Sequence, residues 1–165
     1  MATRVEDDFD AFYAATSRAL LSQLYGLTGD WAEAQDCLQE AYARAWQRWT
    51  AVRELDAPVA WVRVVAFRLA RSRWRRAQQG LRLHRTQLQD DVAGPSPDAV
   101  ALATALRQLP EAQRRALVLH HLGDLSVADV ARETGVPEGT VKARLSRGRA
   151  ALAELLRDDL EATRG

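Results

Sequence analysis

Residues 126–149 read SVADVARETGVPEGTVKARLSRGR, and this stretch contains two helical patterns separated by a glycine. Ser126 followed three residues later by Asp129 is typical of a helix N-terminus, where side chains bond the free backbone amides. Gly135 permits the positive φ that a tight turn after a helix usually requires. A second helical pattern follows, from residue 137 or 138 to residue 156. Two helices joined by so short a turn are typical of a helix-turn-helix.

The second of these helices has an apolar face and a basic face. Val141, Leu145, Gly148 and Leu152 point to one side, toward the expected core. The opposite side is small and is flanked by cations, which suits a helix that enters the major groove of DNA and reaches both phosphate walls. We predict that eight residues face the DNA: Gly139, Thr140, Lys142, Ala143, Arg144, Ser146, Arg147 and Arg149. The alternative is a solvated basic face on a structural helix.

Helical spacing of apolar residues also dominates the N-terminal part, and strand patterns are nearly absent. An apolar stripe over residues 9–24 predicts a first helix that ends near Gly29. Asp30 with Glu33 predicts the N-terminus of a second helix, whose apolar period continues through Trp49.

Pro58 marks the start of a third helix, which we expect to run to about residue 77. Its expected inward residues are Val62, Val65, Ala66 and Leu69. Residues 78–97 then lose the periodicity and contain two Gly and two Pro, which is typical of a linker.

After the linker, Ser96 and Pro97 open another helix, and residues 111–122 form the next one. We expect the first of these to turn Val100, Ala103 and Leu106 inward. The chain is therefore predicted to be all-α. It should form two small helical domains, residues 1–77 and 98–165, joined by a flexible linker over 78–97, with the helix-turn-helix in the second.

The formal net charge is only +1, but the charges are unevenly distributed. Residues 61–85 contain eight Arg and no acidic residue. Arginine beside exposed aromatic rings suits single-stranded nucleic acid, since the rings stack on bases and the cations pair with phosphates. The candidates on the third helix are Trp61, Arg63, Phe67, Arg68, Arg71, Trp74 and Arg75. As an alternative, Phe67 and Trp74 simply complete the core.

The second predicted helix carries acidic residues first and basic residues later on its outer face. These residues are Glu33, Asp36, Gln39, Glu40, Arg44 and Arg48. The order is by itself ordinary complementarity to the helix dipole, and docking of another protein is the less favoured interpretation.

Several other function classes are disfavoured. Cys37 is the single cysteine, which excludes an internal disulfide and a cysteine-cluster zinc site. No apolar run approaches the roughly 20 residues that span a bilayer, and the acidic N-terminus lacks a signal-peptide segment, so we expect a soluble intracellular protein. His84, His120 and His121 form no HExxH motif, and Gly-rich phosphate loops and nucleophile elbows are absent. We therefore expect no enzyme activity, no cofactor and no metal.

Four segments in this order resemble an extracytoplasmic-function (ECF, group IV) sigma factor of bacterial RNA polymerase. They are AQDCLQEAYARAW (34–46), AWVRVVAFRLARSRWRR (60–76), LPEAQRRALVLHHLGDLSVADVARETG (109–135) and GTVKARLSRGRAAL (139–152). The resemblance covers nearly the whole chain except the linker. It implies a specificity subunit with two helical domains that binds core polymerase and directs promoter-specific initiation in the cytoplasm, associated with the nucleoid when active.

The resemblance also implies roles for individual residues. The segment 34–46 matches the family's docking helix for the β′ clamp helices, and the C-terminal domain is implied to contact the β flap. The implied docking residues are Asp36, Gln39, Glu40, Arg44 and Trp46. Segment 60–76, with the loop over 51–58, matches the part that recognises and melts the −10 element, and segment 139–149 the part that reads the −35 element. An anti-sigma factor is the implied regulatory partner.

Three positions depart from the family pattern. Gln35 stands where an acidic residue is common, and Arg68 and Ser72 stand where Asn and Asp are often found. The −10 base preference is therefore not fixed by the resemblance. The main alternative is a dimeric helix-turn-helix regulator that binds palindromic sites without polymerase, but it leaves the Arg-aromatic helix without a role.

Overall fold

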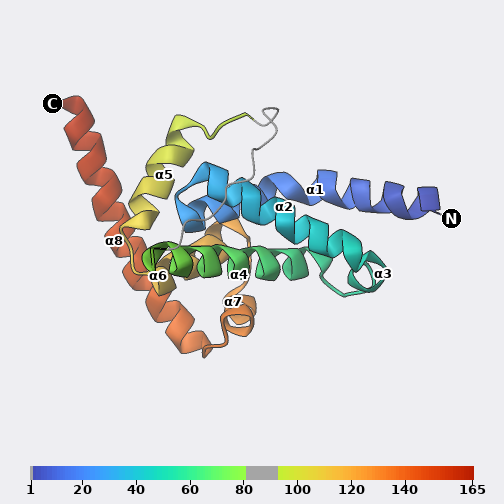
Figure 1. The fold of residues 1–165 in the computed structure, drawn as a ribbon. Helices are drawn as coiled ribbons and strands as arrows, with labels where there is room; N and C mark the ends of the chain where they lie inside the picture. The colour runs from blue at the N-terminus through green and yellow to red at the C-terminus, as the bar shows by residue number, and fades with distance from the viewer. Residues whose placement is uncertain (1, 81–92) are drawn as a thin grey trace. The chain divides into compact units, whose positions relative to one another are not determined.

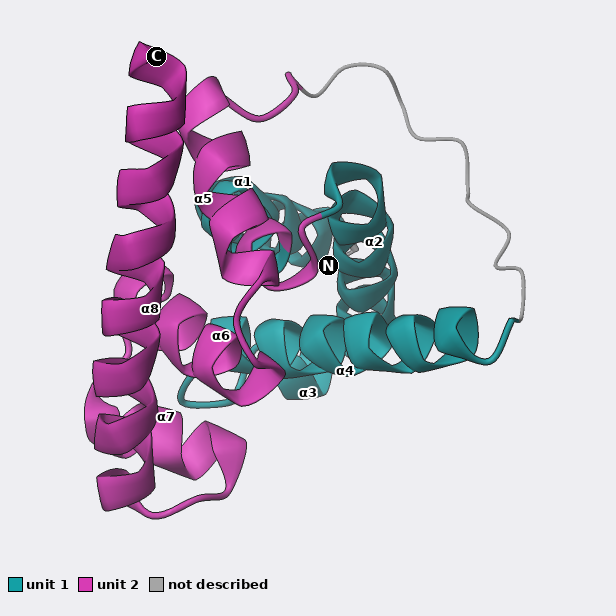
Figure 2. Ribbon diagram, turned by 90° about the vertical axis from the view of Figure 1, so that its left-hand side faces the viewer, with its two compact units in different colours: residues 1–24, 30–92 teal, residues 25–29, 93–165 magenta. Residues whose placement is uncertain are grey.

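The structure is a computed structural model that describes residues 2–80 and 93–165, and every regular element in them is helical (Figure 1). Two compact units are present, residues 1–24 with 30–92 and residues 25–29 with 93–165 (Figure 2). The prediction of an all-α fold with two helical units is confirmed. The elements are α1 (Ala2–Thr28), α2 (Trp31–Gln47), α3 (Trp49–Val52), α4 (Pro58–Gln78), α5 (Pro97–Arg107), α6 (Glu111–Leu117), the π-helical turn η1 (Val118–Leu122), α7 (Val127–Thr134) and α8 (Glu138–Arg164).

The linker expected over 78–97 lies largely outside the described residues, which exclude 81–92. Gln78 is the last residue of α4 and Pro97 the first of α5, so both margins of the expected linker are helical. His84 also lies outside the described residues.

The second helix begins as its sequence predicts. The Asp30 side chain accepts a hydrogen bond from the backbone amide of Glu33 at 3.0 Å, which satisfies one of the free donors of the first turn. The helix is shorter than expected, however, because α2 ends at Gln47 and the short helix α3 starts at Trp49. Trp49 is still buried, so the interruption between α2 and α3 alters the path of the backbone but leaves the predicted apolar residue in the core.

Aromatic residues join α1 to the helices that follow it. The Phe9 ring lies 5.1 Å from that of Trp49, and the Phe12 ring 6.1 Å from that of Tyr42, both between ring centroids. The Thr16 hydroxyl donates to the Phe12 carbonyl at 2.7 Å. Since its one proton is used there, the Tyr42 hydroxyl donates to Thr16 Oγ1 at 2.6 Å. The edge-to-face rings and the bonded hydroxyls fix the α1–α2 contact.

The third long helix, α4, begins at Pro58 as predicted, with proline in its first turn. Its core face is rotated from the expected one. Val62 and Ala66 are fully buried, but Phe67 and Ala70 are buried beside them. The expected core residues Val65 and Leu69 are only half-buried, so that part of the prediction is wrong.

In the second unit, α5 starts at the predicted N-cap, where Ser96 Oγ accepts from the Ala99 amide at 3.2 Å. Ala103 and Leu106 point inward as expected, whereas Val100 is 42% exposed, so its expected burial is wrong. Arg114 of α6 donates to the Leu106 carbonyl at 3.0 Å, which links α6 to the end of α5.

The helix-turn-helix forms as predicted. Ser126 Oγ accepts from the Asp129 amide at 3.1 Å. Helix α7 ends at Thr134 and is followed by Gly135, whose φ of 70° lies in the left-handed region. Val141, Leu145 and Gly148 form the buried face of α8, whereas Leu152, which was also expected there, is only half-buried. A side chain at position 148 would crowd α6, because a Cβ there would lie 2.9 Å from Leu117 Cδ1. Helix α8 continues to Arg164, eight residues beyond the expected end.

We expect Gly135→Ala to lower the free energy of unfolding by about 1 kcal/mol, because alanine is strained in the left-handed region. No atom lies within 4 Å of an added Cβ at Gly135, so the loss would be a backbone effect alone. Gly139→Ala is the matched control, since Gly139 is also open but has no positive φ. Urea unfolding followed by circular dichroism measures both variants; equal losses would contradict the role of the turn.

Candidate functional site

The first three turns of α8 carry the basic face that the sequence predicted for DNA. Val141 and Leu145 are buried, which directs the opposite side of the helix outward. Of the eight predicted residues, Gly139, Lys142, Ser146, Arg147 and Arg149 are exposed, and Thr140, Ala143 and Arg144 are half-buried. Their location on the surface is compatible with groove entry.

The cations of this face have no acidic partner in the part of the chain that the structure describes. Within residues 2–80 and 93–165, no carboxylate forms an ion pair with Lys142, Arg144 or Arg147. By contrast, Arg132 on the preceding helix α7 pairs with Asp129. Unopposed cations on one helix face can displace counterions from phosphates, which is the main source of affinity for DNA.

Two histidines adjoin this face from the π-helical turn η1. His120 Nδ1 lies 2.7 Å from the Leu125 carbonyl oxygen, so Nδ1 carries the proton. Arg149 Nη1 donates to His121 Nε2 at 3.4 Å. Burial, with His120 and Arg149 nearby, lowers the pKa of His121, so its ring is neutral and accepts from Arg149 at neutral pH. The pair supports Arg149 and leaves its positive charge in place.

The Arg-aromatic helix α4 is divided by its packing. Trp74 is 59% exposed, and Arg68, Arg71 and Arg75 are exposed, while Trp61 is half-buried. Phe67 and Arg63 are only 2% and 6% exposed. The alternative that Phe67 belongs to the core is therefore correct, and neither Phe67 nor Arg63 presents a surface for stacking or phosphate contact.

The docking residues expected on α2 also differ in exposure. Gln39, Arg44 and Trp46 are exposed, and Trp46 packs one side against Phe9 with 5.1 Å between ring centroids. Glu40 is half-buried, and its Oε1 pairs with Arg44 Nη2 at 2.7 Å. Asp36 is buried, so it has little surface to offer a partner.

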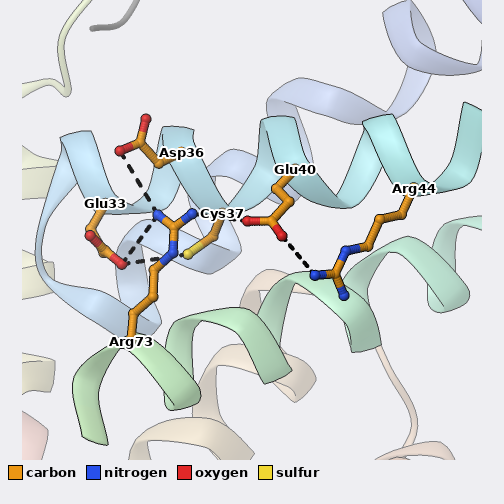
Figure 3. Close-up of polar contacts among 6 residues, drawn as sticks. All are labelled: Glu33, Asp36, Cys37, Glu40, Arg44 and Arg73. Atoms are coloured by element: carbon orange, nitrogen blue, oxygen red, sulfur yellow. Dashed lines mark hydrogen bonds and ion pairs between the residues drawn. The ribbon is translucent and has the colours of Figure 1, made fainter. Parts of the chain in front are cut away.

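Arg73 of α4 connects these acidic residues, and it was not among the predicted site residues (Figure 3). Its Nη2 donates to Glu40 Oε2 at 3.0 Å. Its Nη1 lies 3.5 Å from Glu33 Oε1 and 3.8 Å from Asp36 Oδ2. Burial alone would lower the pKa of Arg73, but the negative groups around it raise that pKa above its ordinary value.

A signal for Arg73 exists in the sequence. Counting by three and four from Val62 gives Ala66, Ala70 and Arg73, so the arginine lies on the apolar stripe of its helix. A charged residue on a core stripe needs a buried partner. The acidic residues of the preceding helix, spaced by three and four, are the available partners.

Comparison with known proteins now defines the family. The model of sigma-70 region 2 matches residues 12–80, and that of sigma-70 region 4 matches residues 99–152. The RNA polymerase sigma-E factor of Streptomyces coelicolor is 32% identical over 160 residues, which cover 94% of this chain and 90% of that protein. The ECF RNA polymerase sigma factor SigM of Mycobacterium tuberculosis is 36% identical over 157 residues, covering 90% and 76%. The chain belongs to the ECF family of RNA polymerase sigma factors.

Solved structures agree with this membership. The sigma factor RpoE of Bartonella quintana, crystallised with the anti-sigma factor NepR, matches with a TM-score of 0.70 and 27% identity, covering 91% of this chain and 97% of that one. CnrH, solved with the cytosolic domain of CnrY, matches with a TM-score of 0.66 at 22% identity, covering 93% and 90%, and supports the fold alone.

As an ECF sigma factor, the protein is a transcription initiation factor that binds core RNA polymerase and promoter DNA and directs initiation at promoters. Among the described helices of this sigma factor, none combines the length and the apolar character needed to cross a membrane.

The cysteine of this ECF sigma factor lies beside the Arg73 contacts. Cys37 is fully buried, and its Sγ lies 3.7 Å from Glu33 Oε1. Burial raises the pKa of the thiol from 9.0 to about 12, and the carboxylate of Glu33 adds to the effect while Arg73 opposes it. The thiol is therefore neutral and unreactive at neutral pH.

We expect Cys37 to react with a disulfide reagent at pH 8 at least about a hundredfold more slowly in the folded chain than in urea. Because folding raises this pKa, the neutral thiol stabilises the fold fully below about pH 9. That contribution is lost between pH 9 and about pH 12. Reagent absorbance measures the rate, with Cys37→Ala as the blank. Rapid stoichiometric labelling of the folded chain would contradict the burial.

Proposed function

We propose that this sigma factor uses two DNA contacts and one polymerase contact, and that it acts by binding and catalyses no bond chemistry of its own. In this assignment residues 1–77 dock on polymerase and open the −10 element, residues 78–97 form the linker, and residues 98–165 read the −35 element. One observation carries the proposal: the same chain has unopposed cations on α8 and an exposed Trp74 on the arginine-rich α4.

The −35 contact is assigned to the N-terminal half of α8. Small residues at 139, 143 and 146 let the backbone approach the base edges, and the surrounding cations reach the phosphates. The proposed contact residues are Gly139, Thr140, Lys142, Ala143, Arg144, Ser146, Arg147 and Arg149.

The −10 contact is assigned to the outer side of α4. Trp74 offers a stacking surface for an unpaired base, and its neighbours supply positive charge for the phosphates. The assigned residues are Trp61, Arg68, Arg71, Trp74 and Arg75. Arg63 and Phe67 are assigned to the core, since both are buried.

The polymerase contact is assigned to α2, which we expect to meet the β′ clamp helices through Gln39, Glu40, Arg44 and Trp46. The C-terminal domain is expected to reach the β flap. Because the similar sigma factor RpoE was solved with an anti-sigma factor, we also propose regulation of this chain by such a partner. We assign its activity to the cytoplasm, at the nucleoid when the polymerase is engaged.

Run-off transcription with purified core polymerase and a promoter library tests the whole assignment. We expect sequence-specific transcripts that depend on added protein, with enriched promoters containing two conserved blocks. Binding to palindromic duplex without polymerase, and no dependent transcript, would instead indicate a dimeric helix-turn-helix regulator.

For the −35 contact, we expect Lys142→Ala and Arg147→Ala each to weaken promoter binding and to reduce the slope of log K against log[salt] by about 0.9. Fluorescence anisotropy over a salt series measures this slope. Arg157→Ala is the matched control, because it removes an exposed cation from the distal part of the same helix. Trp74→Ala should leave the slope unchanged. Unaltered slopes in both test variants would contradict the assignment.

A further inference from the structure

Five charged side chains form a cluster between α2 and α4, which we call the Arg73 cluster: Glu33, Asp36, Glu40, Arg44 and Arg73 (Figure 3). Arg73 projects from α4 across to α2 and meets three carboxylates that lie along one side of that helix. The distances are 3.5 Å to Glu33, 3.8 Å to Asp36 and 3.0 Å to Glu40.

The exposure of the side chains in the Arg73 cluster increases from the interior to the surface. The Asp36 side chain is 3% exposed, Arg73 is 20% exposed, and Glu40 is 38% exposed. At the outer end, Arg44 is 50% exposed and shares Glu40 with Arg73. Asp36 therefore has almost no surface of its own to offer a large partner, whereas Glu40 and Arg44 can touch such a partner directly.

We propose that Arg73 is a positioning residue for polymerase docking: anchored by Asp36 and Glu33, it holds Glu40 in the orientation in which Glu40 and Arg44 meet the polymerase. The inference rests on the proposed docking function of α2. A glutamate fixed in advance loses less side-chain freedom on binding than a mobile one, and the affinity gains accordingly. Asp36, which the sequence suggested as a direct contact, becomes an anchor for Arg73.

Arg73 also connects the docking helix to the helix assigned to the −10 element. The next residue, Trp74, points outward and is 59% exposed, while Arg73 reaches inward to α2. The side chains of adjacent residues on a helix point in directions about 100° apart around its axis. The ion pairs between Arg73 and α2 therefore help fix the direction of Trp74.

Charge and positioning make opposite predictions for loss of Arg73. The cluster has three carboxylates and two guanidinium groups, so it carries one excess negative charge. Replacing Arg73 by Gln makes it more negative, and attraction to a cationic surface on the partner would increase. Positioning predicts weaker binding instead.

The experiment measures the affinity of the full-length, fluorescently labelled chain for core RNA polymerase by anisotropy, with a thermal unfolding curve for every variant. We expect Arg73→Gln and Asp36→Asn each to weaken binding about five- to tenfold. The double variant should be no weaker than Arg73→Gln alone, because Asp36 acts through Arg73. Arg73→Lys should recover part of the affinity, since it keeps the charge but not the planar fork. Arg76→Gln, an exposed arginine on the same helix, is the control and should bind within about twofold of the wild type.

Several results would overturn the inference. If Arg73→Gln binds as Arg76→Gln does, or binds more tightly, Arg73 does not position Glu40. If the losses of Asp36→Asn and Arg73→Gln multiply in the double variant, Asp36 acts independently. If Arg73→Gln does not fold, Asp36→Asn is compared in the wild-type and in the Arg73→Lys backgrounds. If Asp36→Asn lowers the affinity for polymerase by the same factor in both, Asp36 does not act through residue 73, and the inference is refuted.

Glu40→Gln separates this inference from the proposed function. If it weakens polymerase binding and Arg73→Gln does not, docking through α2 stands and the role of Arg73 is refuted. If the wild-type chain does not bind core polymerase, both the proposed docking through α2 and the role of Arg73 are refuted.

Discussion

The packing of α2 against α4 is the constraint on which the first unit depends. Helix α2 brings small residues to its buried side, where Ala34, Ala41 and Ala45 are completely inaccessible. Small side chains let helices approach closely and leave room for larger ones in the same core, such as Phe67. Once Val62 and Phe67 are buried, the direction of every other side chain on α4 follows from the helical period. The exposed arginines and Trp74 are therefore held in place by a contact on the opposite side of the helix.

Much of this arrangement could be predicted from the sequence where the signal is local. The N-cap side chains of Asp30, Ser96 and Ser126 bond the expected amides, and Gly135 adopts the expected left-handed conformation. Each of these depends on a few neighbouring residues and on backbone geometry that one residue type satisfies best. The basic face of α8 was predictable for a related reason, since Val141 and Leu145 fix the inward side of an amphipathic helix.

The rest depended on contacts between segments distant in sequence. The apolar residues of α4 are too numerous to define one stripe. From the sequence alone, Val65 and Leu69 are as good candidates for the core as Phe67, and only the packing of α2 against α4 selects between them. Val100 fits the helical period of α5 yet is exposed. Arg73 was missed because an arginine in an arginine-rich segment suggests a phosphate contact, and its carboxylate partners lie on another helix.

The distribution of ion pairs explains how a chain of net charge +1 can contact a polyanion. Arg73, Arg44 and Arg53 are paired with carboxylates of the first unit, the last of them with Asp8 at 2.8 Å. Lys142 and Arg147 on α8 have no such partner in the part of the chain that the structure describes. Acidic residues therefore neutralise these arginines of the first unit, whereas the cations of α8, on a surface suited to DNA, keep their charge. Net charge sums over both groups, so it conceals the local excess that determines binding.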